Sequence, residues 1–363
     1  MTTSAPPPLH PADRVPPERF QLPVDRMRQG YYADKYFVRT RDVLVQSGRN
    51  PRVTMQLFQK QSACLGGVDE AIAILKLCLS DGWVWRDLEV LALRDGDFVE
   101  PHETVMLVTG PYVAFAHLET VYLGVLARRT RVATNTRRVV EAAWPKPVMF
   151  FPARFDHWLV QTGDGYAAHI AGAIGVSTDA QASWWGAEGI GTVPHGLIAA
   201  FRGDTVAAAR AFAETTAEDV EVIALVDFDN DCVGTSLAVA RALGSRLSGV
   251  RLDTSESMVD RSLVPLMGDF DPRGVNPRLV RLVRAALDAA GFQSVRISVS
   301  GGFDPDKIRR FEREGVPVDS YGVGSSLFGG AYDFTADIVL VDGEPVAKQG
   351  RWYRPNPRLE RVE

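Results

Sequence analysis

The sequence lacks the features of a membrane protein and of a nucleic-acid-binding protein. None of its apolar runs is long enough to span a bilayer, which needs about 20 residues in a helix. The formal net charge is -5 for 363 residues, so the overall charge provides no cationic surface for nucleic acid or an anionic membrane. An anionic ligand must therefore be held by a local group of cations or by backbone N–H groups. We expect neither nucleic acid nor membrane as a partner.

Cysteine is also scarce, and its positions exclude a disulfide framework. The cysteines are Cys64, Cys78 and Cys232. They lack the spacing of metal ligands and cannot all pair, so we expect reduced, partly buried thiols. The first residues are crowded with prolines and contain no hydrophobic stretch, unlike a signal peptide. Residues 1–25 are expected to form a disordered leader, and the protein is expected to be cytoplasmic.

Two absences concern catalysis. After residue 130 the only lysines are Lys146, Lys307 and Lys348, and none of them ends an expected barrel strand. A Schiff-base aldolase is therefore not favoured. The sequence contains neither a GxGxxG nor a Walker A motif, so it supports neither a dinucleotide-binding fold nor a P-loop fold.

The order of strand and helix patterns predicts an α/β protein with two domains. In the front part we expect strands at 35–45, 51–60 and 105–110, a helix at 68–79, and a long helix broken near 129–132. From residue 147 onward, strands alternate with helices of 10 to 15 residues, which indicates a parallel β/α barrel or part of one. A hairpin turning at Asp342-Gly343 is expected to pair back with the front sheet. The expected domains are 26–129 with 331–363, and 130–330.

Two glycine clusters follow the last two expected barrel strands. They lie in SVSGGFDPDKI and YGVGSSLFGG, where each apolar strand leads through glycines to a helix start. In β/α barrels the last two such loops commonly bind a phosphate on backbone N–H groups. Glycine suits this role because a side chain would block the approach of the anion to the main chain. One such loop would be explained equally well as a tight turn, whereas two successive loops favour phosphate binding.

Charged residues end two other expected strands. Asp227 follows one strand, and Arg251 and Asp253 end the next. Arg251 and Asp253 alternate with Leu252, so they point the same way, into the mouth of the barrel. An arginine there is suited to phosphate, and a carboxylate to ribose hydroxyls, Mg²⁺ or a developing cation. A structural ion pair closing the barrel is an equally good interpretation.

One histidine and one strand-end segment are further candidates. His195 follows a Gly-Thr-Val-Pro turn and begins an apolar helix, which suits a proton shuttle or a phosphate acceptor. Phe151 and Arg154 follow the strand at 147–151, where the ring could stack on a flat base or pack in the core. The segment 134–138 offers two cations at an expected helix start, or a solvated face. The other histidines are interpreted as structural or surface residues: His10, His102, His117, His157 and His169.

The ordered motifs QKQSACLGGVDEAIAILK, ATNTRR, GTVPH, LVDFDND, RLDT, SVSGG and GVGSSL resemble those of the nicotinate phosphoribosyltransferases. These are type II phosphoribosyltransferases, together with the nicotinamide and quinolinate enzymes. The resemblance runs from about residue 34 to 348. It implies a split α/β front domain on an irregular, incomplete β/α barrel, with active sites at a homodimer interface. It also implies that nicotinate and phosphoribosyl pyrophosphate form nicotinate mononucleotide and pyrophosphate in NAD biosynthesis, with Mg²⁺ and coupled ATP hydrolysis.

The resemblance also implies roles for individual residues. His195 would accept a phosphoryl group from ATP, and Arg251 and Asp253 would contact the sugar phosphate and its hydroxyls. Asp227 is expected to help stabilise the ribosyl cation. The 5′-phosphate would be held by Ser300, Gly301, Gly302, Gly322, Gly324 and Ser325. The pyridine ring would lie between Phe151 and the neighbouring subunit's equivalent of Tyr36, and Arg137 and Arg154 would bind its carboxylate or the pyrophosphate.

The sequence departs from the family pattern at three places, and these leave other functions open. Thr254-Ser255-Glu256 replaces Ser-Gly-Asp, and Pro152 replaces a glycine. Asp179 resembles the acid that faces the ring's amide in the nicotinamide enzymes. Nicotinamide is therefore the second candidate substrate and quinolinate a less favoured third. A non-catalytic phosphate-sugar binding protein, or a lyase or isomerase acting on a sugar phosphate, would use the same glycine loops.

Overall fold

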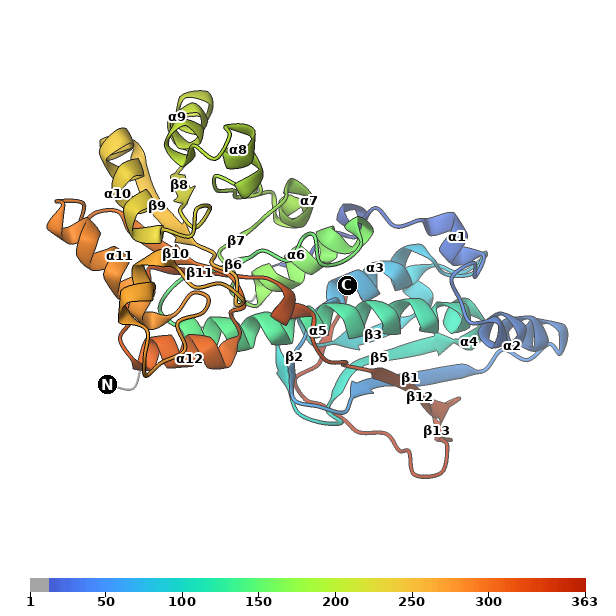
Figure 1. Cartoon of the computed structure of the whole chain (residues 1–363). Helices are drawn as coiled ribbons and strands as arrows, with labels where there is room; N and C mark the ends of the chain where they lie inside the picture. Colours follow the sequence, from blue (N-terminus) through green and yellow to red (C-terminus); the bar gives the residue numbers. More distant parts are fainter. Residues whose placement is uncertain (1–12) are drawn as a thin grey trace.

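The computed structural model describes residues 13–363 and shows two six-stranded sheets connected by one long helix. In Figure 1 the parallel sheet and its helices lie on the left and the antiparallel sheet on the right, and α5 (Glu119–Ala143) runs along both. Each sheet has its own buried apolar cluster. Within residues 13–363, none of the helices is both long and apolar enough to cross a bilayer.

The front sheet is antiparallel and takes strands from both ends of the chain. Its order is β13 (Glu344–Pro345), β12 (Phe334–Val341), β1 (Arg52–Gln59), β5 (Thr104–Pro111), β3 (Glu89–Ala92) and β14 (Glu360–Arg361). Strand β12 pairs with β1 along its length, so the expected hairpin and its pairing are confirmed. The hairpin turns at Asp342 and Gly343, both with positive φ, which is typical of this type of tight turn. A separate two-stranded sheet pairs β2 (Ala63–Cys64) with β4 (Phe98–Val99).

The second sheet is parallel and curls into an open barrel. Its order is β7 (Gly175–Val176), β6 (Val148–Phe150), β11 (Ser320–Val323), β10 (Arg296–Val299), β9 (Leu247–Leu252) and β8 (Val222–Leu225). Within this sheet, β11 is the last strand in sequence order and β6 the first, and the two pair with each other as in a closed barrel. Within the described chain, β7 and β8 do not pair with each other. The expected fold class, an irregular and incomplete β/α barrel beside a separate sheet, is confirmed.

The gap between β7 and β8 is occupied by the irregular segment 190–193. The N–H of Ile190 donates to the carbonyl of Val176 on β7 (2.7 Å), and the N–H of Val193 donates to that of Ile223 on β8 (3.1 Å). The segment therefore satisfies backbone groups on both edges of the opening. It leads directly into α8 (His195–Ala200), which places His195 at the mouth of the barrel.

Helices cover the outside of the barrel. They are α6 (Gln161–Ile170), α7 (Asp179–Ala182), α9 (Thr205–Thr215), α10 (Cys232–Leu243), α11 (Pro277–Ala289) and α12 (Pro305–Arg313). The sequence predicts an N-cap for each of the last two, Asn276 before Pro277 and Asp304 before Pro305, and both caps are present. The Asn276 side chain accepts hydrogen bonds from the N–H groups of Arg278 and Leu279, and Asp304 accepts one from Lys307. The front sheet is covered by α3 (Val68–Leu77) and by α5.

The strand expected at 35–45 is wrong, because the segment forms helix α2 (Lys35–Gln46). Its less exposed residues include Phe37, Arg41 and Leu44, which are spaced by four and three positions as on one face of a helix. The partial alternation in this sequence therefore did not correspond to a buried strand face. Only Phe37 is buried. The apolar pattern was therefore too weak to distinguish the two-residue period of a strand from the 3.6-residue period of a helix.

The break expected at 129–132 is also wrong. Helix α5 is continuous there, and the interruption lies earlier, between α4 (Tyr112–Phe115) and the 3₁₀ turn Ala116–Leu118. Segment 134–138 consequently lies inside a helix instead of at a helix start. The expected domain boundary near residue 130 falls within α5, which packs against elements of both halves.

The leader expected over 1–25 differs from the structure in its second half. Residues 1–12 lie outside the described residues. From residue 13 the chain packs against both halves: the Arg14 guanidinium donates to Asp69 on α3 (2.7 Å), and Phe20 is buried edge-on against Trp184 of the barrel half. Turn Pro17–Phe20 and helix α1 (Val24–Arg28) follow. Proline content therefore did not imply disorder here, because a paired cation and a buried ring hold the segment.

A buried ion-pair network attaches α5 to its neighbours. The Asp164 carboxylate on α6 accepts from Arg128 Nε and Nη2 and from Arg129 Nη1, at 2.8–2.9 Å. Arg129 Nε also donates to Glu70 on α3 (2.9 Å). Arg128 Nη2 also donates to Asp156 (2.7 Å). Asp164, which is 1% exposed, is therefore the buried carboxylate shared by both guanidinium groups, and Asp156 and Glu70 each pair with one of them.

We predict that Asp164→Ala lowers the free energy of unfolding by about 3 kcal/mol, because loss of one partner leaves buried charge uncompensated. Urea-induced unfolding followed by circular dichroism is the measurement. Asp306→Ala removes a 92% exposed carboxylate from its ion pair with Arg309. It is the control and should cost about 0.5 kcal/mol or less. Equal losses in the two variants would contradict the structural role of the network.

Candidate active site

The carboxyl ends of the barrel strands surround a cavity of about 480 Å³. Ligands of β/α barrels bind at this end because the loops that follow the strands converge there. Most of the residues expected in the site line this cavity: Phe151, Arg154, His195, Arg251, Asp253, Ser300, Gly301, Gly302, Gly322, Gly324 and Ser325. They come from four different strand ends and from the segment that occupies the barrel gap, so the fold brings together residues up to 174 positions apart in sequence.

The two glycine loops form one side of the cavity. Gly301 and Gly302 have φ values of +85° and +64°, a conformation that other residues adopt only with strain. A side chain at Gly322 would meet the ring of Phe151, because an added Cβ would lie 2.7 Å from it. The loops therefore carry no side chain of their own at these positions, and Phe151 packs directly on the main chain at Gly322. Backbone without side chains is the kind of surface that binds a phosphate. The Ser300 hydroxyl donates to Asp253 Oδ1 (2.7 Å), which connects the first loop to the neighbouring strand end.

Arg251 and Asp253 lie beside these loops, as the alternation around Leu252 predicts. Leu252 is fully buried in the barrel core, whereas its two neighbours line the cavity. The Nε atom of Arg251 is buried and has no hydrogen-bond partner among residues 13–363. Burial lowers the pKa of this guanidinium, while the nearby carboxylates of Asp253 and Asp227 oppose the shift. A partly desolvated cation with an unused donor is suited to an incoming phosphate.

His195 and Asp227 form a hydrogen-bonded pair at the mouth of the barrel. The imidazole Nε2 lies 3.1 Å from Asp227 Oδ2. The histidine side chain is 46% exposed and the aspartate side chain only 7% exposed. The buried carboxylate therefore holds the ring through one nitrogen, and the ring stays accessible. The hydrogen bond to Asp227 raises the pKa of His195 in spite of partial burial. The arrangement suits an imidazole that becomes positively charged during a reaction.

Aromatic and cationic side chains occupy the remaining wall. The Arg251 guanidinium lies 5.9 Å from the ring centre of Phe151, and that of Arg154 lies 5.8 Å from the ring centre of Phe155. Two rings beside two cations suit a flat, negatively charged heterocycle. Phe155, Ser177, Thr192 and Phe303 also line the cavity and were not expected. Phe155 is adjacent to Arg154, which was a candidate, and Thr192 is part of the GTVPH motif.

Three expected site residues lie elsewhere in the single chain. Arg137 is buried inside α5, where its Nε bonds Glu141 (2.9 Å) and its guanidinium lies over Phe98. Asp179 accepts a hydrogen bond from the Gly189 N–H (2.9 Å) and does not line the cavity. Tyr36 is 59% exposed on α2 in the front half. Its expected contribution to a second subunit's site stays a prediction.

The acidic groups of the site are too few to bind Mg²⁺ without help from a substrate. Within residues 13–363 no cluster of three or more metal-ligand side chains is present. Asp227 Oδ1 is buried without a hydrogen-bond partner in the described structure, and Asp253 lies nearby at the cavity wall. Mg²⁺ bound through one or two carboxylates, together with substrate phosphates and water, is compatible with this set.

Comparisons with known proteins agree with this geometry. A family model described as the N-terminal domain of quinolinate phosphoribosyl transferase matches residues 34–130. The crystal structure of nicotinate-nucleotide pyrophosphorylase from Pyrococcus furiosus is 32% identical, covers 93% of this chain and 84% of that chain, and has a TM-score of 0.78. The chain belongs to the type II phosphoribosyltransferase family. The resemblance in the sequence motifs is thereby confirmed.

Other relatives of the family carry a nicotinate phosphoribosyltransferase name. Nicotinate phosphoribosyltransferase pncB1 of Mycobacterium tuberculosis is 32% identical over 272 residues, which are 72% of this chain and 56% of the relative. This chain thus spans about half the length of the curated relatives it matches. Human nicotinic acid phosphoribosyltransferase is 19% identical with a TM-score of 0.65 over 86% of this chain and 75% of that chain, which shows a shared fold.

We predict that Asp227→Asn lowers the pKa of His195 in the metal-free protein, because the hydrogen bond to the carboxylate is the main cause of its elevation. The charged pair stabilises the structure at low pH, and this contribution disappears as the pH rises through the elevated pKa. An NMR titration of the His195 ring measures the shift. His102, which is exposed on the front half, is the internal reference. An unchanged His195 titration would contradict the pairing.

Proposed function

We propose that this protein is a nicotinate phosphoribosyltransferase acting in NAD biosynthesis. It would join nicotinate to phosphoribosyl pyrophosphate and release nicotinate mononucleotide and pyrophosphate. The observation that carries the proposal is the placement of Arg251, with its unused buried Nε, beside Asp253 and two bare glycine loops in one cavity. Relatives named nicotinate phosphoribosyltransferase support it.

The cavity provides separate places for the parts of the sugar substrate. The glycine loops would hold the 5′-phosphate on backbone N–H groups, and Arg251 would add a charge-assisted contact. Asp253, held in place by Ser300, would then face the ribose hydroxyls and C1. Loss of pyrophosphate leaves positive charge on the ribosyl centre, which the carboxylates of Asp253 and Asp227 would stabilise electrostatically. Mg²⁺, held by these carboxylates and the substrate phosphates, would neutralise the leaving group.

The pyridine base would need no general base, because its ring nitrogen already carries a free lone pair. Positioning therefore accounts for much of the catalysis. Phe151 and Phe155 would hold the ring, and Arg154 would contact its carboxylate. The exposed Tyr36 of a second copy would complete the stack in a homodimer, which we propose as the active form.

The position of Asp179 favours nicotinate over nicotinamide. Its carboxylate is bonded to the Gly189 N–H and does not line the cavity. It therefore does not present a negative charge to the base, and the cations Arg154 and Arg251 do line the wall. Arg154 could form a charge-assisted contact with the carboxylate of nicotinate, whereas the carbonyl oxygen of a neutral amide would accept only a weaker hydrogen bond from it.

ATP would act through the pair of His195 and Asp227. The ring nitrogen not bonded to Asp227 would attack the γ-phosphorus, giving phosphohistidine and ADP. Asp227 would stabilise the positive charge that develops on the imidazole. The exposed ring and the buried carboxylate are suited to these two roles. Hydrolysis of the phosphohistidine would then be coupled to the transferase reaction.

We predict that the purified protein with phosphoribosyl pyrophosphate and Mg²⁺ forms mononucleotide from nicotinate. Its kcat/KM for nicotinate should exceed that for nicotinamide by about 10- to 100-fold, the value of one charged hydrogen bond. Chromatographic detection of the mononucleotide and of pyrophosphate is the measurement. Preference for nicotinamide or quinolinate would transfer the assignment to that substrate. Absence of turnover with all three would favour a binding protein.

We predict that His195→Ala abolishes the stimulation of the reaction by ATP and retains basal transfer, because the residue accepts the phosphoryl group without touching the pyridine. Initial rates with and without ATP provide the test. His102→Asn is the control, since asparagine tolerates the positive φ of this exposed position. Stimulation of the His195→Ala protein to the same degree as the control would refute the role of the histidine.

A further inference from the structure

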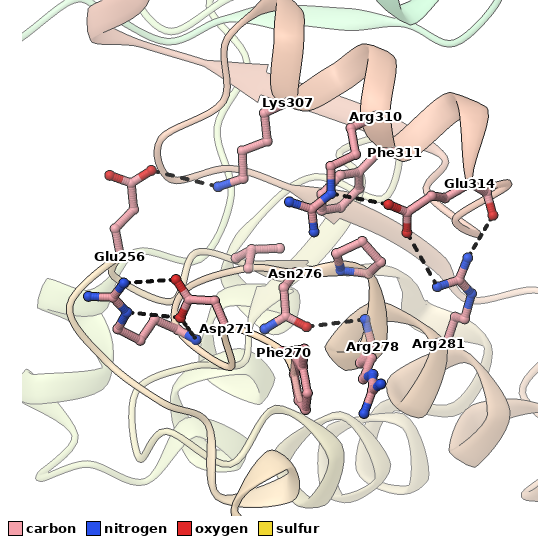
Figure 2. Close-up of a pocket in the computed structure, with 13 residues that line it drawn as sticks. Glu256, Phe270, Asp271, Asn276, Arg278, Arg281, Lys307, Arg310, Phe311 and Glu314 are labelled. Carbon is pink, nitrogen blue, oxygen red and sulfur yellow. Dashed lines mark hydrogen bonds and ion pairs between the residues drawn. The ribbon is translucent and has the colours of Figure 1, made fainter. Parts of the chain in front are cut away.

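A second cavity of about 660 Å³ lies behind the first glycine loop, between α11, α12 and the loop around residues 256–275. It is separate from the active-site cavity, since the two share no lining residue. Figure 2 shows Lys307 and Arg310 on one side, from α12, and Arg278 and Phe270 on the other, with Asn276 between them. The proposed transferase reaction makes no use of this cavity.

The walls of this cavity are rich in positive charge. The cations are Arg273, Arg278, Arg281, Lys307 and Arg310. The carboxylates among the lining residues are Glu256, Asp271 and Glu314, so the lining carries an excess of two positive charges. The side chains come from three separate segments that face one another across the space (Figure 2). A compact anion at the centre would therefore meet cations from opposite sides.

Two of the ion pairs in the wall are loose. Lys307 Nζ lies 3.8 Å from Glu256 Oε1, and Arg281 Nη1 lies 3.9 Å from Glu314 Oε2. Both distances exceed hydrogen-bond length. Arg281 Nη2 donates to the carbonyl of Glu314 (2.6 Å) and Lys307 Nζ to a backbone carbonyl, so each cation keeps its remaining N–H groups for a ligand. Burial lowers the pKa of Lys307, with Glu256 only partly opposing the shift. Glu256 is itself 68% exposed, so an incoming anion would displace it from a weak contact.

Lys307 and Glu256 also contact the phosphate loop of the active site. Lys307 Nζ donates to the carbonyl of Gly301 (3.2 Å). The Glu256 carboxylate lies against the α-carbon of Gly302, where an added Cβ would be 1.9 Å from Oε1. The same two side chains thus form one wall of the second cavity and one support of the loop. A ligand that draws Lys307 away from Gly301, or displaces Glu256, would change the mobility of the loop.

We propose that the second cavity binds a compact polyanion carrying phosphate groups and that its occupancy alters the phosphate loop at residues 300–303 through Lys307 and Glu256. The chemical class of the ligand follows from the excess of cations, the size of the cavity and the opposed guanidinium groups. The binding site does not depend on the proposed transferase function. Its effect on the reaction does depend on that function, because the loop is the expected site of the sugar phosphate.

Binding is tested with inorganic tripolyphosphate by isothermal titration calorimetry at low ionic strength, where screening is weakest. Tripolyphosphate should occupy two sites per chain in the unaltered protein and one in Arg251→Ala, which weakens the active-site anion contact. In the Arg251→Ala background, the added changes Arg278→Ala and Arg310→Ala should weaken the remaining site by about tenfold or more, the loss expected for charged hydrogen bonds. Arg241→Ala, an exposed arginine on α10 that lines neither cavity, is the matched control.

The coupling is tested by hydrogen exchange of the amides of residues 300–303 in the Arg251→Ala protein. Tripolyphosphate should change their exchange, and the change should disappear when Arg278→Ala and Arg310→Ala are added. Binding that is lost entirely in Arg251→Ala, or that is unaffected by Arg278→Ala and Arg310→Ala, would overturn the site. Binding without any change in exchange would overturn the coupling. Neither measurement uses turnover, so failure of the transferase assay would be distinguishable from failure of this proposal.

Discussion

The missing pairing between β7 and β8 is the constraint on which the candidate site depends. A closed parallel barrel would satisfy these strand edges with each other. Here the segment 190–193 bonds to Val176 on one edge and Ile223 on the other. Because this irregular segment must reach across the opening, the chain that follows it arrives at the mouth of the barrel. His195 therefore faces the same cavity as the ends of the regular strands.

The site also depends on charges that the fold leaves incompletely paired. Asp164 accepts hydrogen bonds from two guanidinium groups of α5, whereas Arg251 keeps a buried Nε without a hydrogen-bond partner in the described chain. The first arrangement stabilises the connection between the halves, and the second keeps a cation available. An unused donor in a partly desolvated position is unfavourable for stability, and it is the kind of feature that ligand binding compensates.

Much of the site followed from sequence because strands have a period of two residues. Alternation around Leu252 predicted that Arg251 and Asp253 face the cavity, and the positions of the glycine clusters after two strands predicted the bare loops. Arg137 illustrates the limit of this reasoning. Its motif was interpreted as a helix start, whereas α5 continues through it and directs the side chain to Glu141. The strand predicted at 35–45 was wrong for a related reason, because a single buried phenylalanine does not define a helical or a strand period.

The sequence by itself determined the alternation of strands and helices, the caps at Asn276 and Asp304, and the resemblance to a family, because these depend on short stretches of neighbouring residues. Only the tertiary structure decided that β7 and β8 stay apart, that His195 pairs with Asp227, and that Asp179 is bonded to Gly189 outside the cavity. Those facts depend on the distance and direction between residues remote in the chain. Such distances are set by the packing of whole elements, which no local pattern records.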